Sequence, residues 1–109
     1  MKPIHIITLA AMALAALTGA PATWADDGAA LYAKQCAACH GPKGAADTKP
    51  AQALGIKPFA GNADVTGKSV ADLKAALEAN DKHKAALKAL SGDQLELVLE
   101  HVKALAAGS

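Results

Sequence analysis

The stretch Cys36-Ala37-Ala38-Cys39-His40 decides how this chain folds. One helical turn would place the two cysteines on one side, with the adjacent histidine able to bring its imidazole beneath them. Two cysteines at this spacing, followed directly by a histidine, are typical of covalent haem attachment. The thiols become thioethers to the haem vinyl groups, and the histidine becomes an axial iron ligand. We therefore predict one haem c, attached through Cys36 and Cys39, with His40 on the iron.

Other interpretations of a Cys-x-x-Cys pair fit this chain less well. The pair could be a thioredoxin-like dithiol, half of a four-ligand zinc site, or an ordinary disulfide. The chain has only these 2 cysteines, so a common zinc site would lack its further thiol ligands. No strand-like alternation of β-branched residues surrounds the pair, as a thioredoxin-like βαβ unit would require.

Residues 1–25 have the pattern of a secretory signal peptide. Lys2 supplies the charged start, the run from Ile6 to Leu17 is apolar, and small residues precede a predicted cleavage after Ala25. The apolar run is shorter than the about 20 residues that a membrane span needs. We therefore expect an exported, periplasmic protein without stable membrane insertion, whose residues 26–109 form one domain.

The composition of residues 26–109 limits both partners and core. All 11 basic side chains are lysines, and with Lys2 in the signal the others equal the 10 acidic side chains in number. Net charge therefore favours neither nucleic acid nor a membrane surface as a partner. Tyr32 and Phe59 are the only aromatics left, so the core would be marginal at this length. A covalently held macrocycle would supply the missing apolar bulk.

The first half of the domain predicts one helix followed by a long loop. Asp26 or Asp27 can cap a helix that runs to the cysteines, and Gly41-Pro42 ends it. Residues 41–68 are rich in Gly, Pro, Asn and Asp without a sustained period, which indicates an ordered loop. A loop this long in a small domain is unusual, unless it covers a haem edge.

Ser69 and Asp72 form a weakened capping box that opens the next predicted helix. One apolar face of that helix consists of Val70, Leu73 and Leu77. Asn80 is a candidate C-terminal stop, since asparagine tolerates the left-handed conformation.

Ser91 and Gln94 form a cleaner capping box at the start of the last predicted helix. Its apolar face comprises Leu95, Val98, Leu99, Val102 and Leu105. No strand is needed, so we predict an all-α fold.

These patterns resemble a class I cytochrome c domain over essentially all of residues 26–109. Residues 28–32, Gly-Ala-Ala-Leu-Tyr, look like the family's Gly-x-x-x-aromatic helix before the haem motif, and residues 90–105 look like its C-terminal helix. The resemblance implies a small helical domain wrapped around one covalent haem. It also implies that Gly28 and Tyr32 meet Val98 and His101, Gly28 because it lacks a side chain.

The resemblance also implies a proline carbonyl that accepts the free N–H of His40. Pro50 and Pro58 are both candidates. Pro58-Phe59-Ala60-Gly61 looks closer to the family's Pro-x-Ala-Gly turn, but the choice stays open.

The distal side departs from the family pattern. The family's second ligand is a methionine, but both methionines of this chain, Met1 and Met12, lie in the predicted signal. His83 falls near the expected position, and imidazole is an ordinary haem ligand. The alternatives are an open or water-bound iron, Asn80, or a lysine (Lys82 or Lys84), while His101 is expected to pack between helices.

These expectations lead to a one-electron carrier of low potential, with His40 and His83 as axial ligands and unidentified redox proteins as partners. Lys74, Lys82, Lys84 and Lys88 are candidates for docking an acidic partner. The alternative function is a haem protein whose open or weakly held distal site binds or senses a small ligand. No enzyme is predicted, since no catalytic motif is evident and the chain has no arginine to polarise a peroxide. The oligomeric state stays open.

Overall fold

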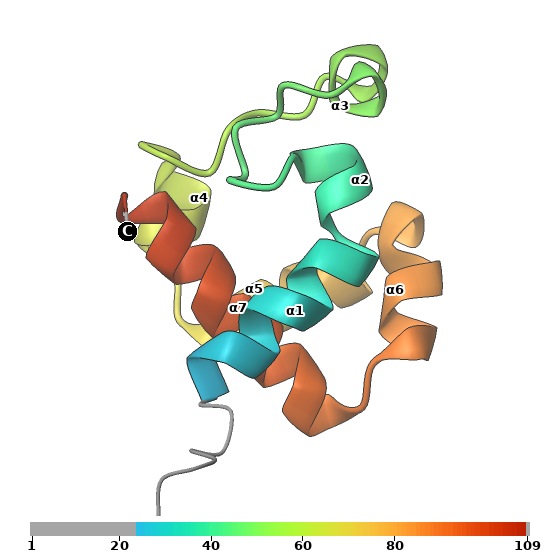
Figure 1. The fold of residues 1–109 in the computed structure, drawn as a ribbon, viewed down its shortest axis with the longest axis vertical. Coiled ribbons are helices and arrows are strands. Elements are labelled where there is room, and N and C mark those ends of the chain that lie inside the picture. Colours follow the sequence, from blue (N-terminus) through green and yellow to red (C-terminus); the bar gives the residue numbers. More distant parts are fainter. Residues whose placement is uncertain (1–23, 109) are drawn as a thin grey trace, which may run out of the picture.

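The computed structural model describes residues 24–108 of the chain, which form helices joined by short connections (Figure 1). The predicted signal peptide lies almost wholly outside the described residues and stays a prediction. No strand occurs in the described part, so the all-α prediction is confirmed. None of its helices is long and apolar enough to cross a membrane. The elements are α1 (Trp24–Gln35), α2 (Ala37–His40), α3 (Lys49–Leu54), α4 (Ala63–Thr66), α5 (Val70–Glu78), the 3₁₀ helix η1 (Asp81–His83), α6 (Lys84–Ala89) and α7 (Gly92–Ala106).

Helices α1 and α7 cross in close contact (Figure 1). A β-carbon on Gly28 would overlap the Leu97 carbonyl oxygen and lie 3.5 Å from the His101 β-carbon. Only glycine therefore allows the two backbones to approach this closely. Tyr32, one turn further along α1, is buried in one core cluster with Val98. The predicted contact between the first and last helices is confirmed.

Both predicted capping boxes are present. The Ser69 and Ser91 hydroxyls accept the amides of Asp72 and Gln94, whose side chains accept the serine amides in return. These reciprocal bonds satisfy amides that the first turn of a helix leaves free.

The apolar faces of α5 and α7 meet in a second core cluster. Leu73 from α5 is buried against Leu95 and Leu99 from α7. Val70 and Leu77 pack against this cluster and are partly buried. The faces predicted from the helical period are thus the faces that the fold buries.

Two predicted helix boundaries are wrong. Helix α1 begins at Trp24, so Asp26 and Asp27 lie inside its first turn instead of capping it. Acidic residues are favourable there too, because the helix dipole is positive at that end. Asn80 does not end α5, whose C-cap is Ala79 in a right-handed conformation. Asn80 is extended instead, and its side chain accepts the Lys82 amide to start η1.

The region predicted as loop, residues 41–68, contains two short helices. Thr48 caps α3 by accepting the Ala51 amide, and Asn62 caps α4 by accepting the Asp64 amide. Helices of 6 and 4 residues are too short to produce a readable hydrophobic period. The rest of the region is irregular, as expected.

We predict that Gly28→Ala lowers the free energy of unfolding of the haem-loaded protein by about 1–3 kcal/mol, because the new methyl group overlaps the α7 backbone. Denaturant unfolding measures the change. Gly92→Ala is the matched control, since nothing lies within 4 Å of the position of its β-carbon. The control should leave stability unchanged or raise it by up to about 1 kcal/mol. Equal effects of the two substitutions would contradict the close crossing.

Candidate functional site

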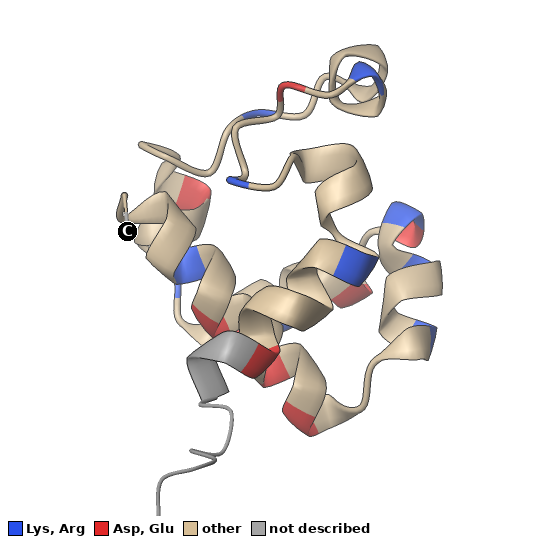
Figure 2. Ribbon diagram, in the orientation of Figure 1, with Lys and Arg blue, Asp and Glu red and all other residues tan. Residues whose placement is uncertain are grey.

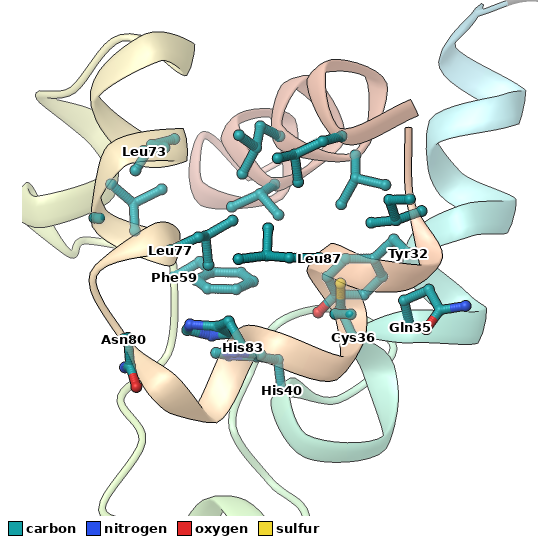
Figure 3. Close-up of a pocket in the computed structure, with 18 of the residues that line it drawn as sticks. Tyr32, Gln35, Cys36, His40, Phe59, Leu73, Leu77, Asn80, His83 and Leu87 are labelled. Atoms are coloured by element: carbon teal, nitrogen blue, oxygen red, sulfur yellow. The ribbon is translucent and has the colours of Figure 1, made fainter. Parts of the chain in front are cut away.

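A largely apolar cavity of about 260 Å³ lies between α1 and α2 on one side and α5, η1 and α6 on the other (Figure 3). Helix α7 closes its base. Both core clusters contribute to its walls. The residues that line it are Tyr32, Gln35, Cys36, His40, Phe59, Asp64, Val65, Leu73, Ala76, Leu77, Asn80, His83, Ala86, Leu87, Leu90, Leu95, Val98, Leu99 and Val102.

The haem-attachment motif lies at one wall of this cavity. Cys36 is the N-cap of α2, and its carbonyl accepts the His40 amide at 3.0 Å. Cys36 lines the cavity, and both cysteines are half-buried free thiols. Burial, with a smaller contribution from Cys39, raises the pKa of the Cys36 thiol to about 11. The thiol therefore keeps its proton at neutral pH.

His40 and His83 face each other in the cavity, although 42 positions separate them in the sequence. Their ring centres are 6.2 Å apart, and the ring planes are within 9° of parallel (Figure 3). Burial lowers the pKa of both imidazoles, and for His40 the charge of His83 lowers it further. Both rings are thus held in the neutral form, which is the form that binds a metal.

The spacing of these rings suits two ligands of one metal ion. Two neutral imidazoles whose centres lie 6.2 Å apart would each be able to offer a ring nitrogen to one metal ion held between them. The Nδ1 atoms of both rings are buried and have no hydrogen-bond partner among the described residues. Two thiols, two neutral imidazoles and apolar walls therefore fit a covalently attached haem.

Phe59 is a site residue that sequence reasoning missed. Its ring stacks on His40 with centres 4.8 Å apart, and its amide donates to the Gly44 carbonyl at 2.9 Å. A β-carbon on Gly44 would overlap the phenyl ring, so the loop and the ring fit closely. The Pro-x-Ala-Gly pattern around Phe59 was the available signal. Neither Pro50 nor Pro58 offers its carbonyl to His40 Nδ1, which has no partner in the described part of the chain.

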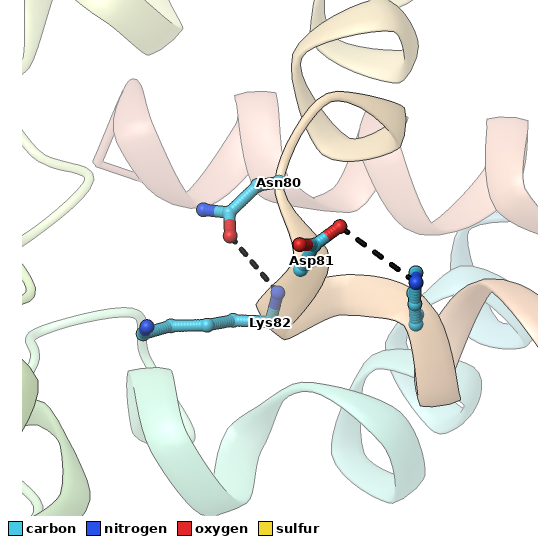
Figure 4. A network of polar contacts seen from close by, with 4 residues as sticks. Asn80, Asp81 and Lys82 are labelled. Atoms are coloured by element: carbon cyan, nitrogen blue, oxygen red, sulfur yellow. Dashed lines mark hydrogen bonds and ion pairs between the residues drawn. The ribbon is translucent and has the colours of Figure 1, made fainter.

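The other candidate distal ligands are placed less favourably than His83. Asn80 lines the cavity, but its side-chain oxygen accepts the Lys82 amide at 3.0 Å (Figure 4). The Lys84 ammonium lies 3.8 Å from Asp81 in an exposed ion pair. Lys82 is also exposed.

His101 lies at the α1–α7 crossing, where its ring centre is 5.2 Å from that of Tyr32. It does not line the cavity. The packing interpretation of His101 is therefore confirmed.

An all-α fold whose cavity is lined by Cys36 and His40 of one Cys-x-x-Cys-His turn defines a c-type cytochrome domain. The family model described as cytochrome c oxidase, cbb3-type, subunit III matches residues 23–102, and the chain belongs to this family. Membership supports covalently attached haem c and a role in electron transfer. Neither the curated proteins nor the solved structures include a match to this chain.

We predict that the same chain produced without haem attachment loses most of its helix content. Without haem, the apolar residues of both core clusters that line the cavity have nothing to pack against. Far-ultraviolet circular dichroism measures the loss, with the haem-loaded protein as the matched control. Full native helix content with a cooperative thermal transition in the haem-free chain would contradict this dependence.

Proposed function

We propose that this protein is a periplasmic one-electron carrier of low reduction potential, with His40 and His83 as the two axial ligands. The observation that carries the proposal is the facing pair of half-buried imidazoles, with ring centres 6.2 Å apart and nearly parallel planes. When bound, haem supplies an iron atom that accepts and releases one electron. The residues of the chain determine whether anything besides an electron can reach that iron.

His83 would close the sixth coordination position. It lies on η1, directly after α5, and Leu77 and Leu87 on either side of it line the same cavity. These apolar side chains exclude water from the distal side, and the imidazole excludes small ligands. A site closed in this way favours electron transfer without substrate chemistry.

The choice of an imidazole as second ligand supports a low potential. A methionine partner raises the reduction potential of a haem, and residues 24–108 contain no methionine. The lysine alternatives would require the exposed Lys82 or Lys84 to turn inward, whereas His83 already lines the cavity.

Lysines beside His83 suit a redox partner with an acidic surface. Lys82, Lys84 and Lys88 are exposed on η1 and α6, and Lys74 lies half-buried on α5. Figure 2 shows basic residues along η1 and α6, with the acidic Asp81 among them, and further acidic residues on α7. Complementary charge would orient the cavity side of the domain toward the partner.

One observation favours a second function, in which a small ligand displaces His83. Neither η1 nor α6 contains a buried residue, and α6 has no side-chain cap. The segment that carries His83 is therefore anchored less firmly than α5 or α7. In a ligand-binding or sensing haem protein, this weak anchoring would let His83 move away when a small ligand binds.

We predict that His83→Ala converts the protein from low-spin to high-spin haem and lets the ferrous form bind carbon monoxide. Absorption spectra of the purified holoprotein in both oxidation states measure the change. His83→Met should remain low-spin and raise the reduction potential, because methionine replaces imidazole.

Lys88→Ala is the control, since this exposed side chain lies on α6 outside the cavity and its loss should leave the spectra unchanged. A wild-type ferrous spectrum that is already five-coordinate and high-spin would reject the carrier and favour the ligand-binding function.

A further inference from the structure

Three consecutive carbonyl groups at the end of α2 each accept a hydrogen bond from outside that helix. They belong to Cys39, to the axial ligand His40 and to Gly41. The donors are, in the same order, the Thr48 hydroxyl, the Ala46 amide at 2.8 Å and the Tyr32 hydroxyl at 2.7 Å. A helix end leaves its last carbonyls without partners inside the helix, so these bonds replace the missing ones.

The Tyr32 hydroxyl is held firmly in place. Its side chain is 1% exposed, and its ring contacts those of Phe59 and His101, whose centres are 6.4 Å and 5.2 Å away. Burial, with smaller contributions from Cys36 and Asp47, raises the pKa of Tyr32 to about 12. The phenol is therefore protonated at physiological pH and always available as a donor to Gly41.

Thr48 connects the end of α2 to the start of α3. Its hydroxyl donates to the Cys39 carbonyl and accepts the Ala51 amide at 3.1 Å. Ala51 is fully buried, so it anchors this junction. One hydroxyl thus uses both its donor and an acceptor site in bridging the two helices.

The His40 ring itself lacks the usual support. Metal-bound histidines almost always donate their second N–H to an oxygen, which sets the ring orientation. Here Nδ1 of His40 has no partner among the described residues. The orientation of the ring therefore depends on the backbone that carries it and on its stacking with Phe59.

We propose that Tyr32 and Thr48 are positioning residues, whose hydroxyls hold the haem-ligand peptide so that the His40 imidazole stays nearly parallel to that of His83. This inference rests on the proposed haem ligation. It assigns to two side-chain hydroxyls the orienting role that a bond to the ring nitrogen has in other sites.

The hydroxyls should also influence the reduction potential. Each donated hydrogen offsets the negative end of a carbonyl dipole at or next to His40, which would hold the iron. Removing a hydroxyl leaves that dipole less compensated, although the Gly41 carbonyl still accepts the Gly44 amide at 3.0 Å. In a site of low dielectric constant this change favours the more positive ferric state. The reduction potential should therefore fall.

The test compares Tyr32→Phe, Thr48→Val and the double variant with the wild-type holoprotein. Tyr32→Phe keeps the ring and removes only the hydroxyl. Thr48→Ser should restore wild-type behaviour, because it keeps the hydroxyl. The matched control is Thr66→Val, which removes an exposed hydroxyl whose bond goes to the Asn62 carbonyl at 3.2 Å.

The expected result is a lower reduction potential, equivalent to about a threefold drop in the reduced-to-oxidised ratio for each hydroxyl lost. Electron paramagnetic resonance of the low-spin ferric protein should show a wider spread of g values, because these values report the angle between the two imidazole planes. The control should change neither quantity.

If the double variant has the wild-type reduction potential and g values, the proposal is overturned, even if the double variant is less stable than the wild type. A high-spin wild-type spectrum would instead reject His83 ligation. In that case the potential of each variant still tests whether the hydroxyls act on His40.

Discussion

The close contact between Gly28 and the Leu97 carbonyl is the constraint on which the rest of the domain depends. Because no side chain stands between the backbones, α1 and α7 cross closely enough to bury Tyr32 between them. The buried phenol then reaches the peptide that follows His40. The helix crossing is thus linked to the candidate iron ligand His40 through one side chain.

The cavity explains how so small a chain can rely on so few large apolar residues. The described core consists of two clusters, one around Tyr32 and Phe59 and one around Leu73 and Leu95. Both line the cavity, and the partly buried Leu90 packs against both. A covalently held macrocycle would join them into one core, so cofactor attachment and folding are expected to be coupled.

The predicted helices agree with the structure where the sequence has a capping box and a clear hydrophobic period. The serine capping boxes of α5 and α7 and their apolar faces are found as predicted. Helix prediction failed where the signal was short or ambiguous. Asn80 has a side chain suited to several turn roles, and the tertiary arrangement uses it to begin η1. Helices α3 and α4 each begin at one side-chain cap, Thr48 and Asn62, within a region that has no period.

The sequence alone determined the cofactor chemistry, because Cys36, Cys39 and His40 are neighbours in the chain and their spacing carries the information. The sequence also indicated His83 as a candidate distal ligand, because both methionines lie in the predicted signal and His83 falls near the position where the family has its methionine. Only the tertiary structure placed His83 opposite His40, stacked Phe59 on that ring and directed the Tyr32 and Thr48 hydroxyls at the ligand peptide. These contacts join residues distant in sequence, and their geometry depends on how α1, α5 and α7 pack.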